Sequence, residues 1–590
     1  MFLAAAGFTQ TLDPLNSILG STLVALIPLA LLLVLLAVMR VTAWLAVIIG
    51  AVVTIVMAIT IWNAPAGSTF GAWGIGAGTG VWSIDWIVFW GVVIYNVLVE
   101  TGAFGHFRQW LITQATADVR VQAIIMAWAM GALLEGLVGF GYPWAVIAPI
   151  LVGLGVAELD AIRVAAIGNN APVSYGALGA PIIALATVTN VPLLTLSASV
   201  GRIVAVLALL PPWILIYLVT GRRGLRGVWP LPVVASLSYI LGQFPTSQWL
   251  GPYLPDVIGA LVSFGALLLL LRYWRPAETL GYGGVPVAAD AALVGAGPAS
   301  AGPAAAGPTG TGTTGAGPAG AGSAGDGAAG AGPAGAGPAG TSGAGERPGG
   351  RAAVPAFLAF GILIVVVVAG TGPWSHLGDY TFVKPEVDAI SSLPSHDTVA
   401  VAWKFAPAIA GTWILISLLV ILAVLRVGVA QIVAAVKRSF AQTWGALLVA
   451  PIVFGLATVF NYAGMASTLA YGFSRVGTWF ILLAPILGWI GVALSGSNTS
   501  TNALFGGFQY AVGGLLRMPL LLLPSLNSVG AEVGKPVAPQ TTSVGVSTSS
   551  YVRREGVVIR HNFGWTLVIL GYLILIGLLY YYVLPAAMRL

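Results

Sequence analysis

The sequence predicts an all-α, polytopic membrane protein with about 12–14 membrane elements, arranged as two inverted repeats that each contain paired broken helices or hairpins. Three observations support this prediction. Charged residues make up 7% of the chain and hydrophobic residues 58%, with a mean hydropathy of +0.96, whereas a soluble domain carries about 25% charged residues. The apolar runs are continuous, unlike the short alternating strands of a membrane barrel. Polar interruptions occur in pairs, at matching places in two halves.

Apolar runs of about 20 residues are long enough to cross a bilayer. We expect full crossings over 19–39, 42–62, 84–102, 200–219, 228–247, 254–273, 354–370, 405–425, 443–460 and 564–585. Other apolar segments are shorter or broken and fit half-helices and hairpins better. They lie near 121–134, 143–156, 181–191, 478–494 and 503–524.

The chain divides into an N-terminal tail (1–18), a first transmembrane half (19–275), a linker (276–353) and a second transmembrane half (354–590). The linker is rich in Gly, Ala and Pro, and its repeated unit spaces glycine by three and two residues. This spacing argues against collagen and favours a disordered segment. Basic residues gather in short loops, and placing these loops in the cytoplasm puts the linker there and the N-terminus outside.

The composition excludes several classes of site. The chain has no cysteine, which rules out disulfides and thiol-based metal sites. The formal charge of +6 needs no nucleic-acid partner, because basic residues in loops act as topology signals. Residues 1–18 contain no Lys or Arg, so we expect no cleavable signal peptide. The four histidines have no metal-ligand spacing, and we expect neither a metal nor a cofactor: His106, His376, His396 and His561.

The polar interruptions are the most informative feature of the sequence. In the first half they run over 135–143 and 168–181, and in the second half over 495–502 and 527–540. Irregular polar backbone is tolerated at membrane depth only where it is buried in protein or lines a wet cavity. Paired breaks in two halves are the best indication in a sequence of a transporter substrate site.

The two halves also match in register. Four residues of the first half recur 358 residues later: Asn169, Pro172, Gly176 and Pro181 align with Asn527, Gly530, Gly534 and Pro539. With the basic loops in the cytoplasm, the chain crosses the membrane inward over 84–102 and outward over the corresponding segment 443–460. The halves are therefore predicted to be inverted repeats.

Glu135 is the predicted proton-coupling carboxylate. It ends one apolar half-helix, and a carboxylate near the bilayer centre costs roughly 2.5–3.5 kcal/mol. The alternative is an acidic residue at a water-exposed helix end. Nearby, Gly139 and Gly141 would let the backbone approach a ligand, although close helix packing explains single glycines nearly as well.

Seven polar side chains in the breaks offer donors and acceptors for a small polar solute. They are Asn169, Asn170, Ser174, Ser497, Asn498, Thr499 and Asn502. The alternative is that they only satisfy broken backbone, but seven groups exceed what two helix ends require.

Two basic residues are candidates for binding a carboxylate. Lys535 is the lysine within a break, and it could pair with a substrate, pair with Glu532 or reach the interface. Arg202, at the head of a crossing, is a candidate anion anchor, with an interfacial role as the alternative. Half-helix N-termini near Pro143 and Pro181 would also favour an anion.

At these motifs the chain resembles the lactate permease family, bacterial symporters of lactate or glycolate with protons. The resemblance covers nearly the whole chain except the linker and the first ~15 residues. The residues that carry it are Tyr95–Gly102, Glu135–Pro143, Gly168–Pro172, Gly176–Ile182, Val200–Arg202, Gly496–Gly506, Gly534–Lys535 and Pro539–Gln540. The predicted binding set accordingly also takes in Phe140, Pro172, Asn527, Ser528 and Gln540.

The chain departs from the family pattern in its acidic residues. Asn498 stands where the family typically has Asp, and Glu532 stands where an apolar residue is usual. We therefore hypothesise that Glu532 has taken over the charge of the missing acid and shares proton coupling with Glu135. The bulky Tyr142 and Trp144 also differ from the pattern, which leaves the exact substrate open.

The resemblance implies a secondary transporter, not an enzyme, that takes up a small 2-hydroxymonocarboxylate with protons across the bacterial plasma membrane. Its partners would be the carboxylate, protons and the lipid bilayer. Alternatives are a sodium-coupled carrier of another organic anion, a channel and a membrane-embedded enzyme. Replacing Na⁺ by choline tests the first, accumulation against a gradient excludes the second, and the absence of catalytic motifs argues against the third. An oligomer is left open.

Overall fold

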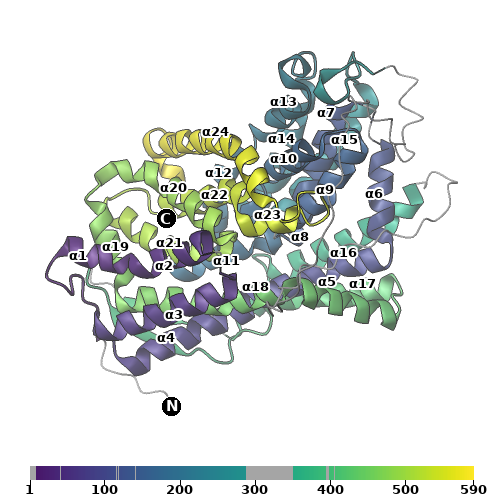
Figure 1. Cartoon of the computed structure of the whole chain (residues 1–590). Coiled ribbons are helices and arrows are strands. Elements are labelled where there is room, and N and C mark those ends of the chain that lie inside the picture. Colours follow the sequence, from purple (N-terminus) through teal and green to yellow (C-terminus); the bar gives the residue numbers. More distant parts are fainter. Residues whose placement is uncertain are drawn as a thin grey trace, which may run out of the picture.

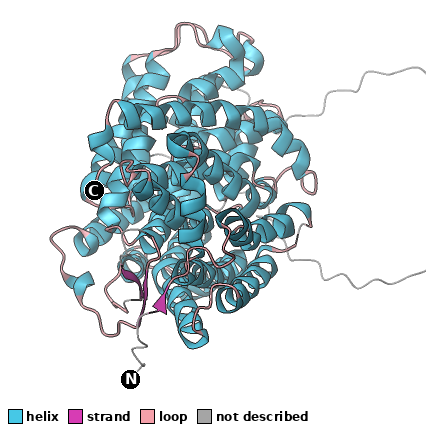
Figure 2. Cartoon of the chain, turned by 90° about the vertical axis from the view of Figure 1, so that its left-hand side faces the viewer, coloured by secondary structure: helices cyan, strands magenta, loops and turns pink. Residues whose placement is uncertain are grey.

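The computed structural model describes residues 8–39, 41–114, 116, 118–139, 141–287, 350–393, 398–403 and 405–590. Helices make up most of this part of the chain, with one small sheet near the N-terminus (Figures 1 and 2). Nine helices there are long and apolar enough to cross a membrane, or up to 11 if each of two bent pairs is one span. The predicted all-α, multi-pass membrane fold is confirmed.

The first half contains helices separated by short irregular turns. Their bounds are α1 Ile18–Ala25, α2 Ile27–Leu33, η1 Val34–Val38, α3 Ala43–Thr60, α4 Ala66–Thr79, η2 Gly80–Asp85, α5 Trp86–Glu100, α6 Ala103–Gln114, α7 Val119–Ala123, η3 Ile124–Met130, α8 Gly131–Leu137, α9 Tyr142–Gly153, α10 Glu158–Gly168, η4 Val173–Tyr175, α11 Gly176–Thr189, α12 Leu193–Leu207, α13 Pro211–Gly224, α14 Pro230–Trp249, α15 Pro255–Tyr273 and η5 Tyr282–Gly284.

The second half has fewer and longer helices. Their bounds are η7 Gly350–Ala353, α16 Val354–Thr371, η8 Leu377–Asp379, α17 Ala410–Val424, α18 Val429–Ala463, α19 Met465–Ser474, η9 Gly477–Trp479, α20 Phe480–Ser495, α21 Asn498–Leu515, α22 Leu522–Gly534, η10 Lys535–Val537, α23 Pro539–Gly545, α24 Glu555–Tyr582 and η11 Pro585–Met588.

The two halves pack against each other. In Figure 1, α3, α4, α5, α17 and α18 lie together along the lower part of the molecule, and α18 of the second half contacts α3, α4 and α5 of the first. The helices of the breaks lie above this group, where α11 contacts α21 and α12 contacts α22.

Helix α4 is absent from the predicted crossings because its glycines hide an apolar helix in the sequence. These glycines allow α4 and η2 to pack closely against α18. A Cβ atom added at Gly76 would lie 2.4 Å from the Phe454 carbonyl oxygen, and one at Gly80 would lie 2.7 Å from the Pro451 Cα atom. Close approach of this kind between membrane helices depends on small residues.

The small sheet ties the N-terminal segment to the second half. Strand β1 (Phe8–Thr9) pairs parallel with β2 (Glu386–Ile390), which pairs antiparallel with β3 (Thr398–Ala402). Phe8 lies opposite Ala389 and Glu386 lies opposite Ala402. The N-terminal segment and the 371–404 region therefore lie at the same face of the molecule. That this face is on the outside of the membrane stays a prediction.

The predicted linker starts too early at residue 276. Residues 276–287 have a defined structure, with a bridge between Leu280 and Pro286. The Leu280 amide donates to the Asp118 carboxylate at 3.1 Å, and Arg120 donates to the Glu278 carbonyl at 2.7 Å. These contacts fix the segment beside α7, and a reading of composition alone cannot detect them. Residues 288–349, the centre of the predicted linker, lie outside the described residues.

We predict that Gly76→Ala lowers the unfolding temperature in detergent, because the added methyl group collides with the backbone of α18. Overpacking of this kind costs about 1–3 kcal/mol. The matched control is Gly74→Ala on the same helix, where an added Cβ meets nothing within 4 Å and the change should be neutral or stabilising. Equal unfolding temperatures for the two variants would show that α4 does not pack on α18 as described.

Candidate functional site

The two breaks of the first half are built differently. Between α8 and α9, Gly139 (φ 69°) and Gly141 (φ 82°) take left-handed backbone conformations that glycine adopts without steric cost. Between α10 and α11 the chain bends by 66°. Here Ala177 and Leu178 also have positive φ angles, of 47° and 55°. Such strain in non-glycine residues persists only where the surroundings impose it.

The breaks of the second half are narrower than the predicted 495–502 and 527–540. Helix α20 ends at Ser495, and α21 starts at Asn498 because the Ser497 hydroxyl caps it, accepting from the Ser500 amide at 3.2 Å. Helix α22 continues to Gly534 before η10 and α23. Pro536 and Pro539 lie at this second break and have no N–H to continue a helix.

All four breaks meet. The Thr541 hydroxyl of α23 donates to the Gly496 carbonyl at 3.1 Å. A Cβ atom at Gly141 would come within 2.8 Å of Thr541, so the α8–α9 break also contacts α23. The Asn502 amide donates to the Pro181 carbonyl at 2.9 Å. These contacts link all four breaks, and a substrate site among them stays a prediction.

A buried ion pair joins the halves at this point. The Lys535 ammonium of η10 donates to Glu135 Oε1 of α8, and Asn169 Nδ2 of α10 donates to Glu135 Oε2 at 2.8 Å. Glu135 is 1% exposed and Lys535 is 5% exposed. A Cβ atom at Gly176 would lie 2.5 Å from Glu135 Oε1, so a glycine is required where the carboxylate sits against α11.

Glu532, on α22, forms a second polar contact between the halves. Its Oε2 atom accepts from the Ser174 amide at 3.1 Å and from the Ser174 hydroxyl, and the Ser174 and Ser528 hydroxyl oxygens are 3.3 Å apart. Glu532 is fully buried, and its Oε1 atom has no partner among the described residues. Of the three roles considered for Lys535, pairing with Glu532 is therefore not the one seen, since Lys535 contacts Glu135.

Ser174 and Glu532 are 358 residues apart, the same spacing that relates the two halves in sequence. If a two-fold axis relates the halves, equivalent residues that touch each other must lie on it. The contact is compatible with an inverted repeat, and the repeat itself stays a prediction.

A chain of amide groups fixes the residues beside the Glu532 contact. Gln509 donates to Asn527 Oδ1 at 2.9 Å, Asn527 donates to Asn502 Oδ1 at 3.0 Å, and Asn502 donates to the Ser528 hydroxyl at 3.0 Å. Asn502 and Asn527 thus largely satisfy each other and the backbone. For Asn502 and Asn527, these hydrogen bonds favour a structural role over binding of the substrate.

Other buried polar atoms of the breaks have no partner among the described residues. These are both amide atoms of Asn170, both amide atoms of Asn498, and Asn169 Oδ1. Buried polar groups are nearly always hydrogen-bonded, and an unmet one costs about 1–3 kcal/mol. Donors and acceptors left open in this way are suited to a polar solute.

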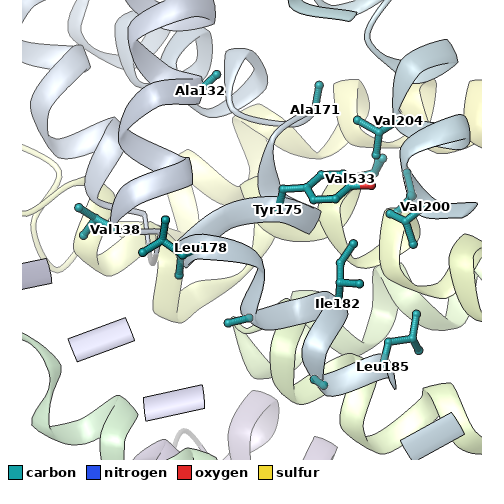
Figure 3. Packing of buried hydrophobic residues seen from close by; sticks show 14 of the residues in the cluster. Ala132, Val138, Ala171, Tyr175, Leu178, Ile182, Leu185, Val200, Val204 and Val533 are labelled. Carbon is teal, nitrogen blue, oxygen red and sulfur yellow. The ribbon is translucent and has the colours of Figure 1, made fainter. Parts of the chain in front are cut away.

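The apolar side of the site surrounds Tyr175. In Figure 3 its ring lies among Val533, Val200 and Ile182, which come from α22, α12 and α11. The Tyr175 hydroxyl donates to the Ser197 carbonyl at 2.5 Å. This anchor fixes η4 and therefore the position of Ser174 beside it.

The remaining predicted residues lie in different places. Pro172 precedes η4, whereas Ser497, Thr499 and Gln540 line a separate small cavity of about 50 Å³. Arg202 donates to the Ala587 carbonyl and, at 3.1 Å, to Gln248, so it holds the C-terminal turn and contacts neither Glu135 nor Glu532. Phe140 lies outside the described residues.

Sequence reasoning missed two carboxylates. Asp256, at the start of α15, is 1% exposed and accepts from the Tyr239 hydroxyl at 2.9 Å. It lies close enough to Glu135 and Glu532 to interact with them electrostatically. Asp85 lies in the middle of the long α4–η2–α5 run and lines the small cavity. An acidic residue inside an apolar span was the available signal in both cases.

His561, one of the four histidines without metal-ligand spacing, takes part in a polar cluster between α10 and α24. It contacts Asp160 at 2.9 Å and also lies against Arg163. The Tyr282 hydroxyl, from the segment after α15, donates to the same Asp160. Partial burial and the neighbouring Asp160 carboxylate raise the pKa of Tyr282 to about 12, so this phenol stays a proton donor at neutral pH.

A wide cavity of about 740 Å³ opens on the side of the sheet. We call it the vestibule. Its walls include the end of α11, part of β3 and one face of α21, and Arg517 is its charged residue. Helix α11 leads from the vestibule to the breaks, because it begins at Gly176 beside Glu135 and ends at Thr189 in the cavity wall.

Comparison with known proteins gives relatives along almost the whole chain. It is 32% identical over 577 residues to the glycolate permease GlcA of Escherichia coli (strain K12), with 98% of each chain covered. It is 29% identical over 581 residues to the L-lactate permease of Bacillus subtilis (strain 168), covering 98% of this chain and 99% of that one. The L-lactate permease of Escherichia coli (strain K12) is 28% identical over 556 residues, with 93% and 94% covered.

Among solved structures, the YdaH transporter of Alcanivorax borkumensis matches with a TM-score of 0.39 and 13% identity over 86% of each chain.

The relatives are permeases, which confirms the prediction of a transporter and not an enzyme. The sequence model of the L-lactate permease family matches residues 21–292 and 376–584. This match covers both halves and all four breaks, and the chain therefore belongs to the L-lactate permease family.

Proposed function

We propose that this chain takes up a small 2-hydroxymonocarboxylate, lactate or glycolate, together with a proton across the plasma membrane, and that the substrate binds where the four breaks meet. The observation that carries the proposal is the ion pair between Glu135 and Lys535, which joins the two halves. Family membership supports the substrate class, and the proton is inferred from the charges at the site.

Charge balance explains why a proton and an anion would bind together. In the empty site, the Lys535 ammonium neutralises Glu135. A proton on Glu135 removes its charge and frees Lys535 to pair with the substrate carboxylate. Both states are then neutral at this pair, whereas binding only the anion or only the proton leaves an uncompensated buried charge, which costs several kcal/mol.

The other buried acids add to this argument. Glu135, Glu532 and Asp256 face a single ammonium group in one buried region. If all three were ionised, two negative charges would be left without partners. Protons held by this group remove that cost, and in the proposal Glu532, bound by Ser174, shares the one coupling proton with Glu135.

The remaining contacts of the substrate follow from the open polar groups. Asn170 and Asn498 each have a donor and an acceptor without a partner in the described part of the chain, which suits the hydroxyl group of a 2-hydroxy acid. The vestibule provides the route of entry, with Arg517 attracting the anion. Movement of one group of helices against the other would then open the site to the opposite side.

We predict that purified wild-type protein in liposomes accumulates radiolabelled L-lactate or glycolate when an inward proton gradient is imposed, and that Glu135→Gln reduces this accumulation at least tenfold (~1.4 kcal/mol). The amide cannot exchange a proton. It leaves Lys535 free, so exchange of labelled for unlabelled substrate should persist in the variant.

The matched control is Glu555→Gln, at the first turn of α24 and outside the breaks, which should accumulate substrate like the wild type. Proton-driven accumulation that survives in Glu135→Gln would move the coupling role to another residue. Replacing Na⁺ by choline in the same assay tests the sodium-coupled alternative.

We predict that Glu532→Gln abolishes proton-driven uptake and that adding Asn498→Asp partly restores it. The physical reason is that the double variant regains one carboxylate among the breaks, at position 498, where the family typically has an Asp. The measurement is initial uptake by the single and double variants at matched protein amounts. A fully active Glu532→Gln single variant would contradict the hypothesis that Glu532 replaced the missing acid.

A further inference from the structure

Asp85 is a carboxylate inside a membrane span for which the proposed mechanism gives no use. It closes η2, a π-helical turn in the continuous helical run from Ala66 to Glu100, and lies near the middle of that run. Among the described residues, no hydrogen bond or ion pair reaches its side chain. Intramembrane carboxylates are costly and mark ion pathways, and π-helical turns recur at functional sites.

Asp85 lines the cavity of about 50 Å³ between η2, α18 and the α20–α21 break. The apolar part of its lining includes Val88, Val449 and Phe454, and Asp85 is the charged residue among the lining residues. The polar part of the lining comes from the α20–α21 break and from α23: Ser495, Gly496, Ser497, Thr499, Ser500 and Gln540. A cavity needs about 10–15 Å³ of such volume to hold one water molecule, so this cavity has room for one small ion with a few water molecules.

The donor set selects the kind of occupant. One carboxylate with hydroxyl and carbonyl oxygens is a hard set with a single negative charge. In the part of the chain that the structure describes, no three His, Cys, Asp or Glu side chains come together as a metal site would need. A divalent ion would leave a net positive charge here, whereas a monovalent cation leaves none.

The cavity is linked to the substrate site through one segment. Gln540 lines the cavity and Thr541 binds the Gly496 carbonyl at the α20–α21 break. Both follow directly after η10, which carries Lys535. A cation at Asp85 and a substrate at Lys535 would therefore act on the same stretch, 535–541, which gives the two sites a direct physical connection.

We propose that Asp85 and the α20–α21 break form a second coupling site, which binds one monovalent cation per transport cycle. This inference rests on the proposed function and deepens it. The exchange at Glu135 and Lys535 carries one proton with one anion and moves no net charge. A further cation at Asp85 makes each cycle carry one positive charge inward, so uptake responds to the membrane potential.

The test uses the full-length protein in liposomes with equal pH on both sides and a potassium gradient with valinomycin, which makes the inside negative. A potential of 100 mV is worth about 2.3 kcal/mol per charge, so wild type should accumulate labelled lactate or glycolate up to about 40-fold. Asp85→Asn should lose this potential-driven accumulation and keep uptake driven by a pH gradient. Asp85→Glu should retain both.

Two arms identify the cation. If potential-driven accumulation survives replacement of Na⁺ by choline and two protons leave the outer medium for each substrate molecule taken up, the cation is a proton. If it is lost in choline, the cation is Na⁺. The matched control is Glu100→Gln, on the same helical run but ion-paired to Arg438 at 3.0 Å outside the cavity, which should behave like the wild type.

The outcomes separate the two proposals. Wild type that exchanges labelled for unlabelled substrate but ignores the membrane potential overturns the second site and leaves the proposed function standing. Wild type that neither exchanges nor accumulates the two substrates overturns the proposed function itself. If the Asp85→Asn variant does not exchange labelled for unlabelled substrate, the Ser500→Ala variant is tested in its place. This variant should need a higher cation concentration for half-maximal accumulation, and an unchanged requirement overturns the proposal.

Discussion

A salt bridge between Glu135 and Lys535 connects the two halves of the chain inside the membrane. Each partner alone would be a buried charge with a desolvation cost of several kcal/mol. The first half can therefore bury Glu135 only because the second half places Lys535 beside it, and the reverse holds for Lys535. The surrounding backbone fits this pair. Gly176 leaves space for the carboxylate, and Asn169 donates to its second oxygen.

The breaks exist because charged and polar groups at membrane depth must be enclosed by protein. Their backbone is turned by left-handed glycines in the first half and by a serine cap and prolines in the second. The long helices α4–α5 and α18 support this region from below in Figure 1. The breaks supply polar groups, while the long helices supply Asp85 and an apolar wall. The proposed substrate site and the proposed ion cavity can therefore share one segment, 535–541, without sharing ligands.

The sequence predicts much of this arrangement, and the failures have physical reasons. Composition and continuous apolar runs identify most spans, and the polar interruptions identify the four breaks. Helix α4 escapes detection because Gly76 and Gly80, which serve close packing, dilute its apolar pattern. The helical state of 527–534 was not foreseen because Asn527 and Ser528 suggest a loop until their hydrogen bonds to neighbouring helices are known. Asp256 and Asp85 each carry a signal in the sequence, an acidic residue in an apolar span, but the residues that they face are known only from the structure.

The most direct test of this account is a double-mutant cycle on the pair itself, measured as thermal unfolding in detergent for wild type, Glu135→Gln, Lys535→Gln and the double variant. Removing one partner of a buried pair costs about 3–5 kcal/mol because it leaves the other charge uncompensated. The account predicts that each single variant unfolds at a clearly lower temperature and that the double variant recovers part of the loss. Losses that add up in the double variant would show that the two residues act independently and that no such pair holds the halves together.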